Sequence, residues 1–83
     1  MDAKNEVRAV LDEVLSLNGR AARFVDATPL LGGIPELDSM AVVAVLTTLE
    51  ERFGITVEDD EIDGSTFATF GSLVEFVQHK LQR

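Results

Sequence analysis

Apolar residues recur every three to four positions in three segments of this 83-residue chain, and glycine and proline interrupt the chain between the first two. This spacing places the apolar side chains on one face of an α-helix, whereas a half-buried strand would show strict alternation. We therefore predict amphipathic helices over residues 3–17, 39–53 and 70–81. Hydrophobic residues make up 46% of the chain, which is enough for one compact core.

The acidic segment 58–63 predicts one further turn of helix, short and exposed. Ile62 is expected to pin this turn to the core, with Phe67 as a second candidate. The four elements together predict an all-α fold, a small four-helix bundle with three main helices and one short helix. Because the chain has no internal repeat, low-complexity tract or linker, we expect one domain over residues 1–83.

The ends of the first two helices are marked by residues with distinct conformational preferences. Asn18-Gly19 and Gly54 tolerate the left-handed conformation that closes a helix, so the two helices should stop there. Asp38 is the expected N-cap of the second helix, because its carboxylate can accept a hydrogen bond from a free N–H group of the first turn. Ser39 then becomes the first residue of that helix.

The third helix has two possible starting signals. Thr69 can act as its N-cap, or Ser72 and Glu75 can form a capping box. Lys80 and Arg83 lie at the opposite end, where positive charge complements the helix dipole.

Residues 18–38 predict a long loop, because four glycines or prolines follow Gly19 there. Only residues 20–25 could form a short turn of helix within it. Loops of this length in small domains are usually functional or packed by their own side chains. The apolar residues available for that packing are Phe24, Leu30, Leu31, Ile34 and Leu37.

The chain is strongly acidic, with a formal net charge of −8. Seven acids and one base lie within residues 50–63, whereas residues 1–24 hold four of each. Nucleic acids and anionic bilayers would be repelled, so basic protein surfaces are the expected partners. We expect the protein to be a monomer.

The chain has no cysteine, so any thiol chemistry must come from an added group. Its first residues include Asp2 where a secretory signal would be basic, and no apolar run approaches the roughly 20 residues that span a bilayer. We therefore expect no membrane span and a cytoplasmic location.

The stretch from Gly33 to Met40 brings a hydroxyl group, that of Ser39, to the start of the second helix. Unpaired N–H groups and the positive end of the helix dipole favour an attached phosphate at such a position. An Asp-Ser pair before a helix is also ordinary capping chemistry, so the dipeptide alone leaves both interpretations open.

The wider pattern closely resembles the attachment segment of the acyl carrier proteins. The pattern runs from Asp38-Ser39-Met40 through the apolar face of the second helix to the residues around Glu50-Glu51 and Gly54. The resemblance implies that a phosphopantetheinyl transferase joins a 4′-phosphopantetheine arm to Ser39 through a phosphodiester. It also implies that Asp38 helps to position the magnesium ion of the transferase, and that the arm carries acyl groups as thioesters to acyl-loading and acyl-transfer enzymes.

The chain departs from the commonest pattern of that family. Glu36 and Met40 replace a glycine and a leucine, and Ala41 and Ala44 stand where carriers of fatty acid synthesis often have acids. Two runs, Gly19-Arg20-Ala21-Ala22-Arg23 and the stretch from Pro29 through Gly32-Gly33 to Met40, look more like those of specialised stand-alone carriers, such as those associated with bacterial exosortase and exopolysaccharide systems.

Helix phase also predicts a surface for partners next to the serine. If the residues Val42, Val45, Leu46 and Leu49 face inward, the outward apolar side chains form a docking patch. Two acids would add electrostatic steering toward basic surfaces. The predicted partner-binding residues are Met40, Val43, Ala44, Thr47, Glu50 and Glu51.

A calcium-binding loop is one alternative for the acidic segment. Asp59, Glu61, Asp63 and Gly64 stand at positions one, three, five and six of an EF-hand pattern. Position twelve requires a bidentate carboxylate but is Phe70, so we expect no specific metal site.

Two alternatives concern the chain as a whole. An enzyme finds little support, because the only histidine, His79, is expected on the surface and no catalytic triad can be assembled. The second alternative is an acidic helical protein-interaction module that is never modified at Ser39.

Overall fold

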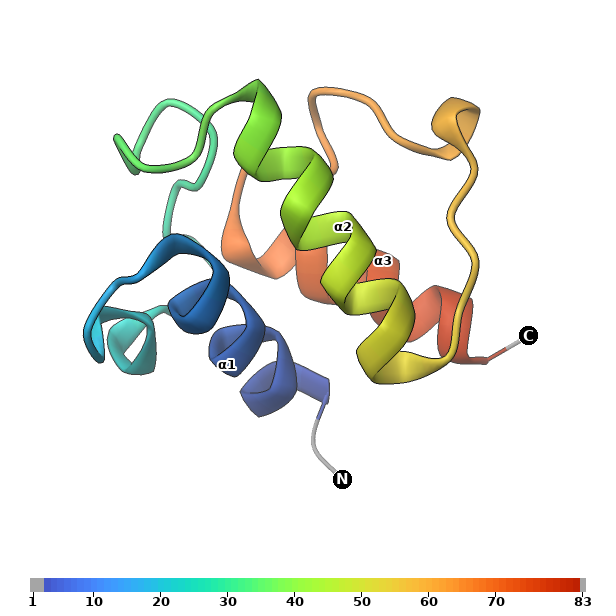
Figure 1. The fold of residues 1–83 in the computed structure, drawn as a ribbon, viewed down its shortest axis with the longest axis horizontal. Helices are drawn as coiled ribbons and strands as arrows, with labels where there is room; N and C mark the ends of the chain where they lie inside the picture. The colour runs from blue at the N-terminus through green and yellow to red at the C-terminus, as the bar shows by residue number, and fades with distance from the viewer. Residues whose placement is uncertain (1–2, 83) are drawn as a thin grey trace.

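The computed structural model describes residues 3–82, apart from the side chain of Asp59. It contains three α-helices, α1 (Ala3–Leu15), α2 (Ser39–Phe53) and α3 (Phe70–Leu81). Two short 3₁₀ helices, η1 (Arg20–Arg23) and η2 (Asp59–Glu61), lie in the connections. Figure 1 shows α2 in front of α3, with α1 beside both.

The predicted all-α fold is confirmed. Among the described residues the only β-type pairing is an isolated bridge between Pro29 and Thr69. The predicted bounds of α2 and α3 agree with the structure, and both expected short turns, near residues 20–25 and 58–63, are present as η1 and η2.

The core is built by all three helices together with the two long connections. On α2, Val45 and Leu49 are buried, while Val42 and Leu46 pack at the edge of the core. Phe70, at the start of α3, lies edge-on to Phe24 with ring centroids 5.9 Å apart. The buried apolar residues are Val7, Val10, Leu11, Leu15, Leu17, Ala21, Leu30, Ile34, Leu37, Val45, Leu49, Phe67, Phe70, Leu73, Val74 and Val77.

The first helix ends two residues earlier than predicted. It stops at Leu15, and Ser16 takes a left-handed conformation with φ 54°. The N–H group of Leu17 then donates to the carbonyl of Asp12 (3.0 Å), which is the hydrogen bond of a Schellman motif. Leu17 leaves the helix because this closure buries its side chain in the core. The spacing of apolar residues in the sequence does not reveal this stabilising burial.

Two starting signals were possible for α3, an N-cap at Thr69 or a capping box of Ser72 and Glu75, and the structure shows Thr69 as the N-cap. The Thr69 hydroxyl accepts from the Ser72 N–H group (3.1 Å), and the Ser72 hydroxyl accepts from the Thr69 N–H group (3.1 Å). This is a capping box in which serine takes the place of the usual acid. Arg83, expected at the opposite end of the helix, lies outside the described residues.

The connection before α2 is held against the start of α3 by four backbone hydrogen bonds. The N–H groups of Leu30 and Leu31 donate to Ala68 and Phe67 (3.0 and 2.9 Å). In return the N–H groups of Phe70 and Gly71 donate to Thr28 and Asp26 (2.8 and 3.0 Å). Leu31 was expected inside this loop but is exposed, since its backbone rather than its side chain faces the neighbouring segment.

The acidic turn η2 is fastened to α3 by an almost buried lysine. The side chain of Lys80 is 9% exposed, and its Nζ donates to both carboxylate oxygens of Glu61 (2.8 and 3.0 Å). Ile62 packs against the core, as predicted, and Phe67 is buried five residues further along the chain. Glu61 and Ile62 of the acidic segment therefore hold η2 against the rest of the fold.

Gly33 offers a test of how tightly the loop is packed. A Cβ atom there would lie 2.6 Å from the Pro29 carbonyl oxygen, so Gly33→Ala must displace backbone and should cost about 1–3 kcal/mol of unfolding free energy. Gly64→Ala is the matched control, because a Cβ at Gly64 meets nothing within 4 Å. Urea unfolding should show a lower unfolding free energy for Gly33→Ala than for Gly64→Ala. Equal stability of the two variants would contradict close packing of Gly33 against Pro29.

Candidate functional site

The loop delivers Ser39 to the start of α2, and Asp38 caps the helix as predicted. Asp38 has an extended backbone (φ −112°, ψ −174°), and its Oδ1 accepts from the N–H group of Ala41 at 2.8 Å. Its carbonyl accepts from the N–H group of Val42 at 2.9 Å, which begins the helix. Ser39 is therefore the first residue of α2, and it is exposed.

This position fits a covalently attached phosphate. The first N–H groups of an α-helix have no partner within the helix, and together with the helix dipole they favour negative charge. The side chains on either side leave room, because Asp38 is exposed and Met40 is 80% exposed. A phosphodiester on the Ser39 oxygen would thus lie in solvent at the positive end of α2.

An apolar strip runs along α2 away from the serine. Val43 is 62% exposed, and Ala44 and Thr47 are exposed with it, so the predicted outward face is confirmed. A groove borders the strip between α2 and the connection that contains η2. Its lining residues are Val43, Leu46, Thr47, Glu50, Val57, Glu58 and Ile62.

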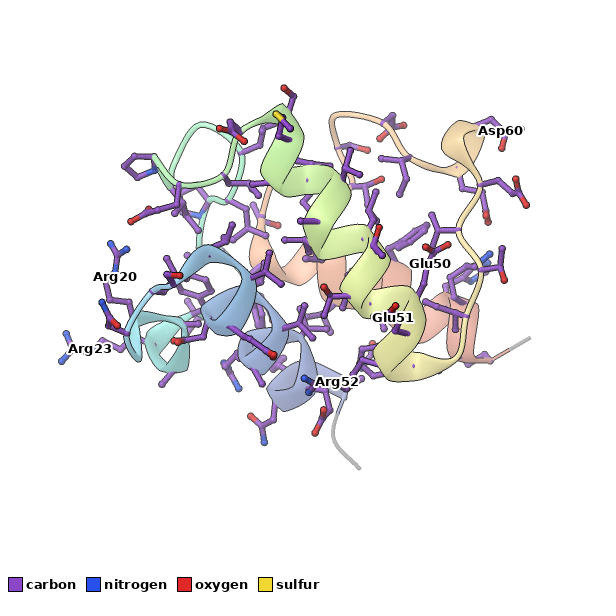
Figure 2. The ribbon with its side chains drawn as sticks, in the orientation of Figure 1. Arg20, Arg23, Glu50, Glu51, Arg52 and Asp60 are labelled. Atoms are coloured by element: carbon purple, nitrogen blue, oxygen red, sulfur yellow. The ribbon has the colours of Figure 1, made fainter. Side chains whose placement is uncertain are left out.

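The acids near the C-terminal end of α2 have different surroundings. Glu51 is exposed, whereas the Glu50 Oε2 accepts from the N–H group of Val57 at 2.7 Å. Glu50 therefore anchors the next connection in addition to contributing charge. Figure 2 shows Glu50, Glu51 and Asp60 on one side of the molecule.

Three of the arginines lie apart from this acidic side. Arg20 and Arg23 project from η1 at the opposite edge of the view in Figure 2. Arg52 turns toward α1, where its guanidinium pairs with Glu6 (3.0 Å) and Glu13 (3.4 Å). Arg52 is the only base within residues 50–63, and it is thus paired with acids of α1 rather than with Glu50 or Glu51.

Sequence reasoning missed one polar contact beside the site, the ion pair between Arg20 and Glu36. Glu36 lies three residues before the serine, and the hydrogen bond from Arg20 holds the pKa of this carboxyl group below its usual range. The two residues are 16 positions apart. A pattern of neighbouring residues contains no signal for such a pair, although Glu36 itself stood out because it replaces a glycine of the family.

Two acids of the calcium-loop alternative, Glu61 and Asp63, are engaged in the fold, and the side chain of Asp59 lies outside the described structure. The Asp63 Oδ1 accepts from the N–H group and the hydroxyl of Ser65 (2.9 and 2.6 Å), and these bonds lower the pKa of Asp63. Glu61 pairs with Lys80, and Phe70 is buried where the twelfth ligand would have to stand. His79, the residue considered for an enzyme, is exposed.

Comparison with known proteins defines the class. The family model of the phosphopantetheine attachment site matches residues 5–77, and the chain belongs to this family. Among solved structures, the chain is similar to the solution NMR structure of a holo acyl carrier protein from Nitrosomonas europaea. The two are 52% identical over the full length of both chains, with a TM-score of 0.91. A search of the curated proteins finds no match.

The chain is therefore a carrier protein and not an enzyme, and 4′-phosphopantetheine is its prosthetic group. Carrier domains of this family are modified by phosphopantetheinyl transferases and interact with acyl-handling enzymes. Within residues 3–82, no helix is long and apolar enough to cross a membrane.

The cap at Asp38 can be tested by its contribution to stability. Asp38→Ala removes the acceptor for the Ala41 N–H group and should cost about 1 kcal/mol of unfolding free energy, as for other N-caps. Asp38→Asn retains an acceptor oxygen and should lose much less. Thermal unfolding measures the stability of both variants. An alanine variant as stable as wild type would show that the cap is not formed.

Proposed function

We propose that Ser39 is the residue that receives the phosphopantetheine arm, and that the arm carries acyl groups as thioesters between partner enzymes. The observation that supports the proposal is the exposed Ser39 hydroxyl at the first position of α2, directly after its N-cap. In the transfer, the Ser39 oxygen bonds to the phosphorus that bears the pantetheine of coenzyme A. The pyrophosphate bond breaks, adenosine 3′,5′-bisphosphate leaves, and the hydroxyl proton passes to a base of the transferase.

Asp38 is suited to a second task beside capping. Its Oδ1 is occupied by the Ala41 N–H group, and the carboxylate is exposed, so Oδ2 can face the magnesium ion of a transferase. A carboxylate oxygen is the kind of ligand that magnesium prefers. We propose this role from the family pattern, in which the same aspartate precedes the serine.

The strip along α2 is the proposed contact surface for the transferase and for acyl-handling enzymes. Met40, Val43, Ala44 and Thr47 would supply the apolar contact. Glu51 and the exposed part of Glu50 would attract a basic surface at the rim and raise the rate of encounter.

The sequence departures at Glu36, Met40, Ala41 and Ala44 argue against a carrier of general fatty acid synthesis. The runs Gly19–Arg23 and Pro29–Met40 support a specialised stand-alone carrier, of the exosortase or exopolysaccharide type. We propose that it works as a monomeric single domain in the cytoplasm, where coenzyme A and the transferase would be available to it.

Modification of Ser39 can be measured directly. Incubation with coenzyme A, magnesium and a broad-specificity phosphopantetheinyl transferase should add one phosphopantetheine to the wild type and none to Ser39→Ala, as read by intact mass. Ser65→Ala is the matched control, since Ser65 is an exposed serine outside α2, and this variant should be modified fully. A wild-type mass that stays unchanged while a known carrier is modified would favour the unmodified interaction module instead.

The contact surface can be tested with two similar valines. Val43 and Val25 are 62% and 58% exposed, but only Val43 lies on the strip. Val43→Gln should raise the KM of the transferase for the carrier about fivefold, the effect of losing roughly 1 kcal/mol at an interface. Val25→Gln should leave KM unchanged, and an equal effect of the two substitutions would argue against the strip.

A further inference from the structure

The last part of the loop before Ser39 has a single polar attachment to the rest of the fold. Between residues 32 and 37 the N–H groups of Gly33, Ile34 and Leu37 donate only to carbonyls within the same loop. Over the described part of the chain, the hydrogen-bonded ion pair of Glu36 is the one polar contact that joins this stretch to another element.

Arg20, the partner of Glu36, makes a second hydrogen bond besides the ion pair. Arg20 donates from Nη2 to Glu36 Oε2 and from Nε to the carbonyl of Leu17 (3.2 Å). Leu17 is 1% exposed and is bonded through its N–H group to Asp12 of α1. The guanidinium group therefore connects the loop to the end of α1.

The ion pair complements the apolar anchors of the loop. Ile34 and Leu37 are buried, so they fix the depth of the loop against the core. Glu36 lies between them in sequence and faces outward to Arg20. The ion pair would thus resist sideways movement of the segment that continues directly into Asp38 and Ser39.

We propose that Arg20 is a positioning residue for the modification of Ser39, which acts by holding the loop through Glu36. The inference rests on the proposed function of Ser39. A transferase binds the carrier in one conformation of the loop, and its apparent affinity falls with the fraction of carrier in that conformation. Loss of the ion pair should therefore raise KM and leave kcat nearly unchanged.

The test compares neutral variants of the pair with a neighbouring arginine. Arg20→Gln and Glu36→Gln should each raise the KM of the transferase about threefold, in line with the modest strength of exposed ion pairs. The double variant should be no worse than either single one, because both remove the same contact. Arg23→Gln changes the charge of η1 equally. Because the side chain of Arg23 makes no hydrogen bond or ion pair within residues 3–82, this variant should behave as wild type.

A charge-swapped carrier separates positioning from direct recognition. In Arg20→Glu/Glu36→Arg the pair can form again, so KM should return to within about twofold of wild type. A transferase that recognises the charge of Glu36 directly would give a different result. Its KM would change in opposite directions in Arg20→Gln and in Glu36→Gln, and the charge swap would not restore KM. That pattern, or unchanged KM in both single variants, would overturn the proposal.

Amide hydrogen exchange of the unmodified protein gives a second measurement that does not depend on Ser39. The N–H groups of Gly33, Ile34 and Leu37 should exchange several times faster in Arg20→Gln than in Arg23→Gln, while those of α3 should not change. Equal exchange in the two variants would overturn the positioning role. If the wild type is not modified at all but exchange still differs, the proposed function fails and the loop contact remains.

Discussion

The four backbone hydrogen bonds between residues 26–31 and 67–71 are the constraint on which the rest of the structure depends. They pair backbone groups of the buried residues Leu30, Phe67 and Phe70, and they lay the connection across the start of α3. Gly71 permits this close approach, since a Cβ there would lie 2.8 Å from the carbonyl oxygen of Asp26. With the connection fixed at this point, the residues that remain before Ser39 start from a defined position beside α3, and beyond it they are held by the buried side chains of Ile34 and Leu37 and by the ion pair of Glu36.

Much of the fold could be predicted from the sequence wherever local chemistry decides. Asp38 and Gly54 mark the two ends of α2, and the same residues form its N-cap and its left-handed C-cap in the structure. The end of α1 could not be predicted in this way. Leu17 leaves the helix to enter the core, and that gain depends on residues that are distant in the sequence. The pairing of the loop with the start of α3 escaped prediction for the same reason, because it joins backbone groups about 40 positions apart.

The same distinction between local and long-range interactions applies to the candidate site. Ser39, its cap and the outward strip on α2 follow from helix phase, which is a local property. Glu50 was predicted only as a surface charge, but one of its oxygens holds the N–H group of Val57. Lys80 was assigned to the dipole of α3 and in fact secures η2 through Glu61. Charged residues with two tasks are hard to predict, because the second task depends on tertiary neighbours.

The placement of Arg52 has a mechanical consequence for the carrier. This residue joins the last turn of α2 to Glu6 and Glu13 of α1, whereas at the opposite end Glu36, three positions before α2 begins, pairs with Arg20 of η1. The two ends of the longest helix are thus flanked by partly exposed ion pairs, while its middle is held by the buried side chains of Val45 and Leu49. Because dissolved salt screens exposed charges, high ionic strength would loosen the ends of α2 before its middle.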